Sequence, residues 1–91
     1  MVYRHYSSED IRILRKSLGI SPEELANMVG ITRQTIYNVE KGKTNSIPTL
    51  IALTVVLDDI CEEQMGMKGD KYLELTRYGV NIMMRVIKRK M

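Results

Sequence analysis

Apolar residues recur at helical spacing along most of the 91-residue chain. In residues 7–19, Ile11, Leu14 and Leu18 are three and four positions apart, so they share one face of a helix. Ser7 or Ser8 begins this segment as the N-cap, and Gly19 ends it, where a left-handed C-terminal cap is favoured. The pattern predicts a first helix of about three turns.

The next segment, SPEELANMVG over residues 21–30, has the signals of a second helix. Ser21 followed by Glu24 is a capping box, and Pro22 suits the first helical position because it has no N–H to leave unpaired. Gly30 ends the helix. The residues expected to face inward are Leu25, Met28 and Val29.

A third helix is predicted over residues 32–42, TRQTIYNVEKG, with Thr32 as its cap and Gly42 at its end. Its apolar residues, which we expect to pack inward, are Ile36, Val39 and Tyr37. Only Gly30 and Ile31 separate the second helix from Thr32. Two short helices joined by so tight a turn indicate a helix-turn-helix whose helices cross steeply.

Residues 46–59 predict a buried fourth helix, with Ser46 as the cap and apolar residues on most faces. Asp59 and Glu62 form another capping-type pair, which predicts a short fifth helix over 59–65. Residues 66–70 contain two glycines and are expected to be a linker. A last helix is predicted from about Lys71 to Lys90. No strand pattern is visible, so the predicted class is all-α.

Composition narrows the possible sites. The one cysteine, Cys61, cannot form an internal disulfide, and together with the one histidine, His5, it cannot make a zinc site, so we expect neither metal nor cofactor. The first ten residues lack the apolar run of a signal peptide, and no apolar run is long enough to cross a membrane. We therefore expect a cytoplasmic protein.

The formal net charge of +3 hides an uneven distribution. Residues 1–56 carry seven basic and five acidic side chains, a net charge of +2. Residues 57–70 carry one basic and five acidic side chains, which gives −4, and residues 71–91 carry six and one, which gives +5. A mildly basic chain suits a polyanionic partner.

Four short blocks stand at a defined spacing in residues 14–42: LR at 14–15, SPEELA at 21–26, GITRQTI at 30–36 and EKG at 40–42. Residues 11–57 thus resemble the Cro/phage-repressor type helix-turn-helix domain, the Xre family. The resemblance covers about half the chain. It implies a five-helix, lambda-repressor-like domain that binds double-stranded DNA, usually as a dimer, with the third helix in the major groove. We place this domain at residues 1–65 and expect a linker and an additional C-terminal helix, a candidate dimerisation element, at 66–91.

The resemblance implies base contacts from Arg33, Gln34 and Asn38. Arginine can donate two hydrogen bonds to guanine, and glutamine or asparagine can form a pair of hydrogen bonds with adenine. Gln34 and Asn38 are four positions apart, hence on one face. The alternative is a solvent-exposed polar helix start.

Contacts to the DNA backbone are expected from the helix starts and from the loop after the third helix. The candidates are Ser21, Thr32, Thr35, Tyr37, Lys41, Lys43, Thr44 and Asn45. A solvated turn would explain the loop composition equally well. Pro22 departs from the family, where a glutamine at this position touches the DNA backbone. Arg15 and Glu40 match a pair that in relatives forms a buried ion pair, which we interpret as structural.

The segment after residue 70 carries two apolar stripes at helical spacing. We expect one to pack on the protein's own domain and the other on a second copy. The residues assigned to the dimer interface are Leu75, Ile82, Met83 and Val86. The alternative is a helix packed entirely within a monomer.

The sequence favours a DNA-binding transcriptional regulator, a repressor that binds an inverted-repeat operator as a homodimer. The alternative is an antitoxin that binds a protein partner through its C-terminal helix and autoregulates its operon. We expect no enzyme, because no Ser/His/Asp set, metal cluster or glycine-rich phosphate loop is visible.

Overall fold

The computed structural model describes residues 4–44 and 46–77 and places five helices in them. The helices are α1 (Ser8–Ser17), α2 (Pro22–Val29), α3 (Arg33–Glu40), α4 (Ile47–Met65) and α5 (Gly69–Arg77). The described part contains no strand, and the predicted all-α class is confirmed. None of these five helices is long and apolar enough to cross a membrane.

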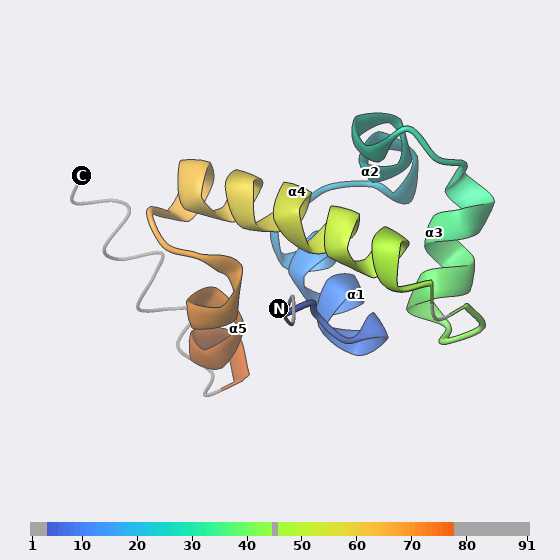
Figure 1. Cartoon of the computed structure of the whole chain (residues 1–91). Coiled ribbons are helices and arrows are strands. Elements are labelled where there is room, and N and C mark those ends of the chain that lie inside the picture. Colours follow the sequence, from blue (N-terminus) through green and yellow to red (C-terminus); the bar gives the residue numbers. More distant parts are fainter. Residues whose placement is uncertain (1–3, 45, 78–91) are drawn as a thin grey trace.

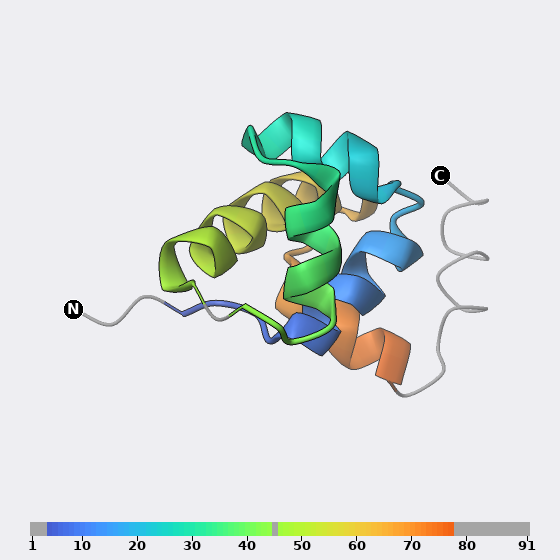
Figure 2. The same cartoon turned by 90° about the vertical axis from the view of Figure 1, so that its right-hand side faces the viewer.

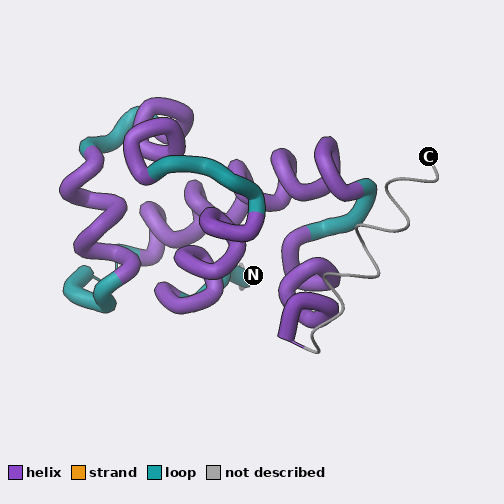
Figure 3. Tube along the Cα trace, turned by 180° about the vertical axis from the view of Figure 1, so that it is seen from behind, coloured by secondary structure: helices purple, strands orange, loops and turns teal. Residues whose placement is uncertain are grey.

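The longest helix, α4, forms the axis of the arrangement (Figure 1). Helices α2 and α3 lie toward its first residues and α5 lies at its other end, while α1 packs against α3, α4 and α5. The view from behind shows the same order (Figure 3). The fully buried side chains come from α1 to α4, namely Ile11, Leu14, Leu25, Ile36, Val39, Leu53, Leu57 and Cys61. An aliphatic core of this kind follows from a sequence without Trp or Phe.

The first three helices begin at side-chain caps. The Oγ atom of Ser7 accepts a hydrogen bond from the backbone N–H of Asp10 at 3.1 Å. Ser21 and Glu24 form the predicted capping box in both directions. Gly30 ends α2 with φ of 82°, a left-handed conformation that glycine adopts without steric cost. This conformation allows the chain to turn within two residues, Gly30 and Ile31, before Thr32 caps α3.

The predicted break between a fourth and a fifth helix is wrong, because α4 continues without interruption to Met65. Leu57 and Cys61 are four residues apart and both fully buried, so the apolar face continues through the segment that was expected to restart. Asp59 is exposed and caps nothing in that position. The helix ends instead at Gly66, with φ of 71°.

Two predictions at residue level also need correction. Met28 was expected to face inward but is 54% exposed, because the buried face of α2 centres on Leu25 and Ala26, with Val29 partly buried beside them. Ser46 precedes α4 as predicted, yet its side chain makes no capping hydrogen bond.

The segment before α1 joins α4 to α5. The backbone N–H of Tyr6 donates to Oγ1 of Thr54 at 2.9 Å, and the Tyr6 hydroxyl donates to Oδ1 of Asp58. The same carboxylate oxygen accepts the backbone N–H of Gly69 at 2.8 Å. Helix α5 therefore begins at Gly69 rather than at Lys71. In its middle, Tyr72 and Leu73 are buried in the common core.

Candidate nucleic-acid interface

Helix α3 is fixed to the protein by one apolar face. Ile36 and Val39 are fully buried, and α3 packs against α2 and α1. Its start is fixed by Thr32, whose hydroxyl accepts the backbone N–H of Thr35 at 3.2 Å. These contacts set the rotation of the helix and therefore decide which side chains point outward.

The outward edge of α3 carries the three residues predicted to contact bases. Arg33 and Gln34 are exposed and Asn38 is half-buried. The Nε2 atom of Gln34 donates to Oδ1 of Asn38 at 3.2 Å, so the two amides are presented side by side. The Arg33 guanidinium lies 6.0 Å from the centre of the Tyr37 ring, at the outer limit of a cation–π contact.

Tyr37 does not pack inward as its apolar ring led us to expect. It is 38% exposed, because the buried face of this short helix is occupied by Ile36 and Val39. Its ring therefore lies on the outer side of α3, beside Arg33.

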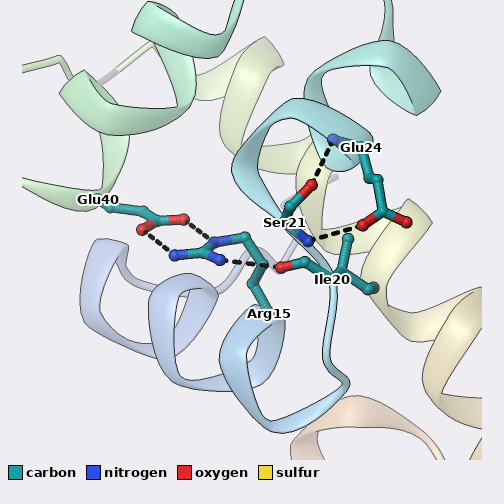
Figure 4. Close-up of polar contacts among 5 residues, drawn as sticks. All are labelled: Arg15, Ile20, Ser21, Glu24 and Glu40. Carbon is teal, nitrogen blue, oxygen red and sulfur yellow. Dashed lines mark hydrogen bonds and ion pairs between the residues drawn. The ribbon is translucent and has the colours of Figure 1, made fainter.

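A buried ion pair holds α3 against α1, as the family resemblance implied (Figure 4). The Arg15 Nε atom lies 2.6 Å from Oε2 of Glu40, and Nη2 donates to Oε1 at 3.0 Å. The remaining terminal nitrogen, Nη1, donates to the carbonyl oxygen of Ile20 at 2.9 Å. The sequence did not reveal this third contact, because a carbonyl acceptor leaves no signal in residue identity. One guanidinium thus fixes α1, the connection to α2 and the end of α3.

The candidate backbone-contacting residues divide into two groups. Ser21 and Thr32 are already engaged as caps, and the Thr32 hydroxyl also bonds the Thr35 hydroxyl at 2.8 Å. In the loop after α3, Lys41 and Lys43 are exposed. The half-buried Thr44 follows them, and Asn45 lies outside the described residues.

The loop after α3 folds back onto the end of the helix. The backbone N–H of Lys43 donates to the carbonyl oxygen of Asn38 at 2.8 Å, and that of Gly42 donates to Val39 at 3.0 Å. The loop that carries both lysines therefore stays close to the end of α3 (Figure 2). Because the carboxylate of Glu40 is neutralised by Arg15, the residues from 32 to 44 present a net positive surface from Arg33 and the two lysines.

No group of three or more His, Cys, Asp or Glu residues that could hold a metal ion occurs within 4–44 and 46–77. Of the residues assigned to a dimer interface, Leu75 lies in α5 and is half-buried. The other three, Ile82, Met83 and Val86, lie outside the described part of the chain.

Comparison with known proteins is consistent with this geometry. A protein from Methanothermobacter thermautotrophicus, named "Uncharacterized HTH-type transcriptional regulator", is 56% identical over 41 residues. This match covers 45% of the present chain and 56% of the relative, so the chain spans about half the length of the curated protein it matches. No solved structure matches significantly. A family model described as helix-turn-helix matches residues 11–60, more than half of the chain. The chain therefore belongs to the helix-turn-helix family of the Cro/phage-repressor type.

Proposed function

We propose that the protein is a sequence-specific DNA-binding transcriptional regulator with α3 as its recognition helix. The observation that carries the proposal is the division of α3 into two sides. Ile36 and Val39 are fully buried, whereas the Arg33, Gln34 and Asn38 side chains form an outward polar edge. A major groove about 12 Å wide admits one helix and offers donors and acceptors to such an edge.

The hydrogen bond between Gln34 and Asn38 supports a joint role in base reading. This bond uses one N–H of the Gln34 amide and the side-chain oxygen of Asn38. The side-chain oxygen of Gln34 can still accept a hydrogen bond, and the amino group of Asn38 can still donate. This combination matches the donor and acceptor on the major-groove edge of adenine. Arg33 is suited to guanine. Each good bidentate contact discriminates between bases by roughly 1–3 kcal/mol.

Phosphate contacts are assigned to the loop after α3 and to the helix starts. Lys41 and Lys43 are exposed directly beside α3 and supply the positive charge. The start of α2 is less favourable, because Pro22 offers no N–H and the exposed Glu23 and Glu24 would repel a phosphate. We therefore propose that the loop after α3 contributes more to the affinity for DNA than the first turn of α2 does.

In the fuller form of the proposal, the protein is a cytoplasmic repressor that binds an inverted repeat as a dimer and occludes a promoter. The half-sites would be about one helical turn apart. The relative that is named a transcriptional regulator supports the regulatory role. That the C-terminal helix binds a second copy or another protein remains a prediction. Sedimentation at increasing protein concentration tests binding of a second copy, and co-purification tests binding of another protein.

Selection of bound duplexes from a random pool tests the proposal. The wild-type protein should enrich a palindromic motif. Gln34→Ala should change the enriched bases, whereas Gln64→Ala, which removes an exposed glutamine of α4, should not. Lys43→Ala should weaken binding to all duplexes alike, with Lys68→Ala as its matched control. Equal binding of the wild-type protein to every duplex would refute sequence-specific recognition.

A further inference from the structure

A pocket lies where the segment before α1, the middle of α4 and the start of α5 meet. Its volume is about 340 Å³, at the small end of the roughly 300–1,000 Å³ that is typical of small-molecule sites. None of the residues that line it belongs to α3. Four of the lining residues are charged, namely Arg4, Asp58, Lys68 and Asp70. The pocket is therefore small, polar and separate from the candidate nucleic-acid interface.

Hydrogen bonds between the three segments hold the inner wall of the pocket. The backbone N–H of Tyr6 donates to Oγ1 of Thr54 at 2.9 Å, and the Tyr6 hydroxyl donates to Oδ1 of Asp58. The same carboxylate oxygen accepts the backbone N–H of Gly69, the buried first residue of α5, at 2.8 Å. The pocket is thus formed before any ligand binds, which reduces the entropic cost of binding.

The charged side chains around the pocket are not paired with each other. Arg4, Lys68 and Asp70 are exposed, and Asp58 is half-buried. Within the described part of the chain no ion pair joins any two of the four. Both hydrogen bonds to Asp58 from the described residues go to Oδ1, so Oδ2 has capacity to accept another. Two positive and two negative groups therefore surround one cavity and are available to a ligand.

We propose that this pocket binds a small zwitterion, a molecule of amino-acid or dipeptide size that carries an ammonium group and a carboxylate. The formal charges of the pocket cancel, so a simple anion or a simple cation gains little from its field. A ligand with both charges can meet opposite charges at both of its ends. We assign Arg4 and Lys68 to the ligand's carboxylate. Asp70 and Oδ2 of Asp58 are assigned to its ammonium group.

A bound zwitterion would connect α5 to the rest of the domain. Lys68 directly precedes α5 and Asp70 lies in its first turn, whereas Arg4 precedes α1 and Asp58 belongs to α4. A ligand that binds only the folded state stabilises that state in proportion to its occupancy. The pocket thereby makes the attachment of α5 dependent on a small molecule. This inference does not rest on DNA binding, and its test uses no DNA.

Thermal unfolding of the full-length chain with the standard amino acids and glycylglycine, each at millimolar concentration, tests the inference. At ten times its dissociation constant, a bound zwitterion should raise the unfolding midpoint by about 5–10 °C. The N-acetylated form of that ligand lacks the ammonium group and its amide lacks the carboxylate, so both should raise the midpoint far less. The inference is overturned if no zwitterion raises the midpoint, or if acetate or ethylammonium raises it equally.

Variants that remove one charge locate the site. Asp70→Asn and Lys68→Gln should each weaken binding of the selected zwitterion about fivefold in isothermal titration calorimetry. Asp59→Asn and Lys71→Gln are the matched controls, because both residues are exposed close by in the sequence and neither lines the pocket. The controls should bind as the wild-type protein does. Equal losses in the pocket variants and the controls, or no loss in either pocket variant, would refute the assignment.

Hydrogen exchange measures the connection to α5. Addition of the selected zwitterion to the wild-type protein should slow exchange of the α5 backbone amides, and in Asp70→Asn the same concentration should slow them less. Unchanged exchange in α5 on saturation of the wild-type protein would contradict the connection. Thermal unfolding without ligand verifies that each variant is folded; should Asp70→Asn not fold, Lys68→Gln takes its place in both measurements.

Discussion

Arg15 and Glu40 are joined by two parallel hydrogen bonds, of 2.6 and 3.0 Å, between α1 and the last residue of α3. Their side chains are only 9% and 5% exposed. The pair lies at the opposite end of α3 from Thr32, so α3 is fixed at both ends. The ion pair thereby orients the candidate interface without taking part in it.

Removal of one partner should be costly because it leaves a buried charge unpaired. We expect Glu40→Ala or Arg15→Ala to lower the free energy of unfolding by about 3–5 kcal/mol. Replacement of both residues by apolar side chains of similar size should cost much less, apart from the lost bond to the Ile20 carbonyl. Urea denaturation of the two single variants and of the Arg15→Met/Glu40→Leu double variant measures the difference. Equal losses in all three would contradict this account.

The serines before α2 and α4 provide a matched test of capping. Ser21 accepts the backbone N–H of Glu24 at 3.0 Å, whereas Ser46 makes no capping hydrogen bond. Ser21→Ala should therefore destabilise the protein by about 1 kcal/mol, with Ser46→Ala well below that. Thermal unfolding compares them directly. A loss at Ser46 as large as at Ser21 would show that the hydroxyl has another role.

The sequence predicted the first three helices well, because each has a cap, an apolar face and a terminal glycine within a few residues. It failed between Leu57 and Met65, where the local pair Asp59 and Glu62 looked like a helix start. The continuation of α4 depends on burial of Cys61 against other parts of the chain. A local signal cannot report such a tertiary contact.

Gly69 has no room for a side chain. A Cβ atom there would lie 2.5 Å from the Tyr6 hydroxyl oxygen, 2.7 Å from Oδ1 of Asp58 and 2.8 Å from a methyl group of Leu14. We expect Gly69→Ala to destabilise the protein by about 1–3 kcal/mol through overpacking. Tyr6→Phe removes one of the clashing atoms. Chemical denaturation should therefore show that the double variant loses less than the sum of the single losses; additive losses would contradict the clash.

Alkaline pH should destabilise the fold through Cys61. Burial, with a smaller effect of Asp58 and Asp70, raises the pKa of its thiol to about 11 from an ordinary value of about 9. Burial and then the hydrogen bond to Asp58 also raise the pKa of Tyr6. Between pH 9 and 11 the unfolded chain releases the cysteine proton and the folded chain retains it, so the free energy of unfolding falls as pH rises.

Denaturation at several pH values measures this effect. The decline above pH 9 should be shallower in Cys61→Ala than in the wild-type protein, because the variant lacks that proton. Cys61→Ala also lowers stability at neutral pH by leaving a small cavity, but this loss is independent of pH. Parallel profiles above pH 9 would show that the thiol does not contribute.

At the candidate interface, the family motif predicted that Arg33, Gln34 and Asn38 face outward from α3, and in the structure they lie on one outward edge; their contact with bases stays a prediction. The motif did not predict whether Tyr37 is buried, because a tyrosine fits both an apolar and a polar position of a short helix. Its exposure is decided by the neighbours Ile36 and Val39, which fill the space under the helix. The bond from Gln34 to Asn38 depends on rotamers, to which residue identity is only a guide.

The proposed roles of Gln34 in base contact and of Lys43 in phosphate contact predict how DNA affinity depends on salt concentration. A lysine that neutralises one phosphate contributes about 0.9 to the slope of log affinity against log salt concentration, whereas a glutamine that reads a base contributes almost nothing. Lys43→Ala should therefore make the slope shallower by about that amount per copy of the protein. Gln34→Ala should leave the slope unchanged and lower affinity for the selected motif. Fluorescence anisotropy between 50 and 200 mM salt, a range over which phosphate contacts weaken strongly, measures both quantities. A steep slope retained in Lys43→Ala would place this lysine away from the phosphates and leave Lys41 and the helix starts as the source of non-specific affinity.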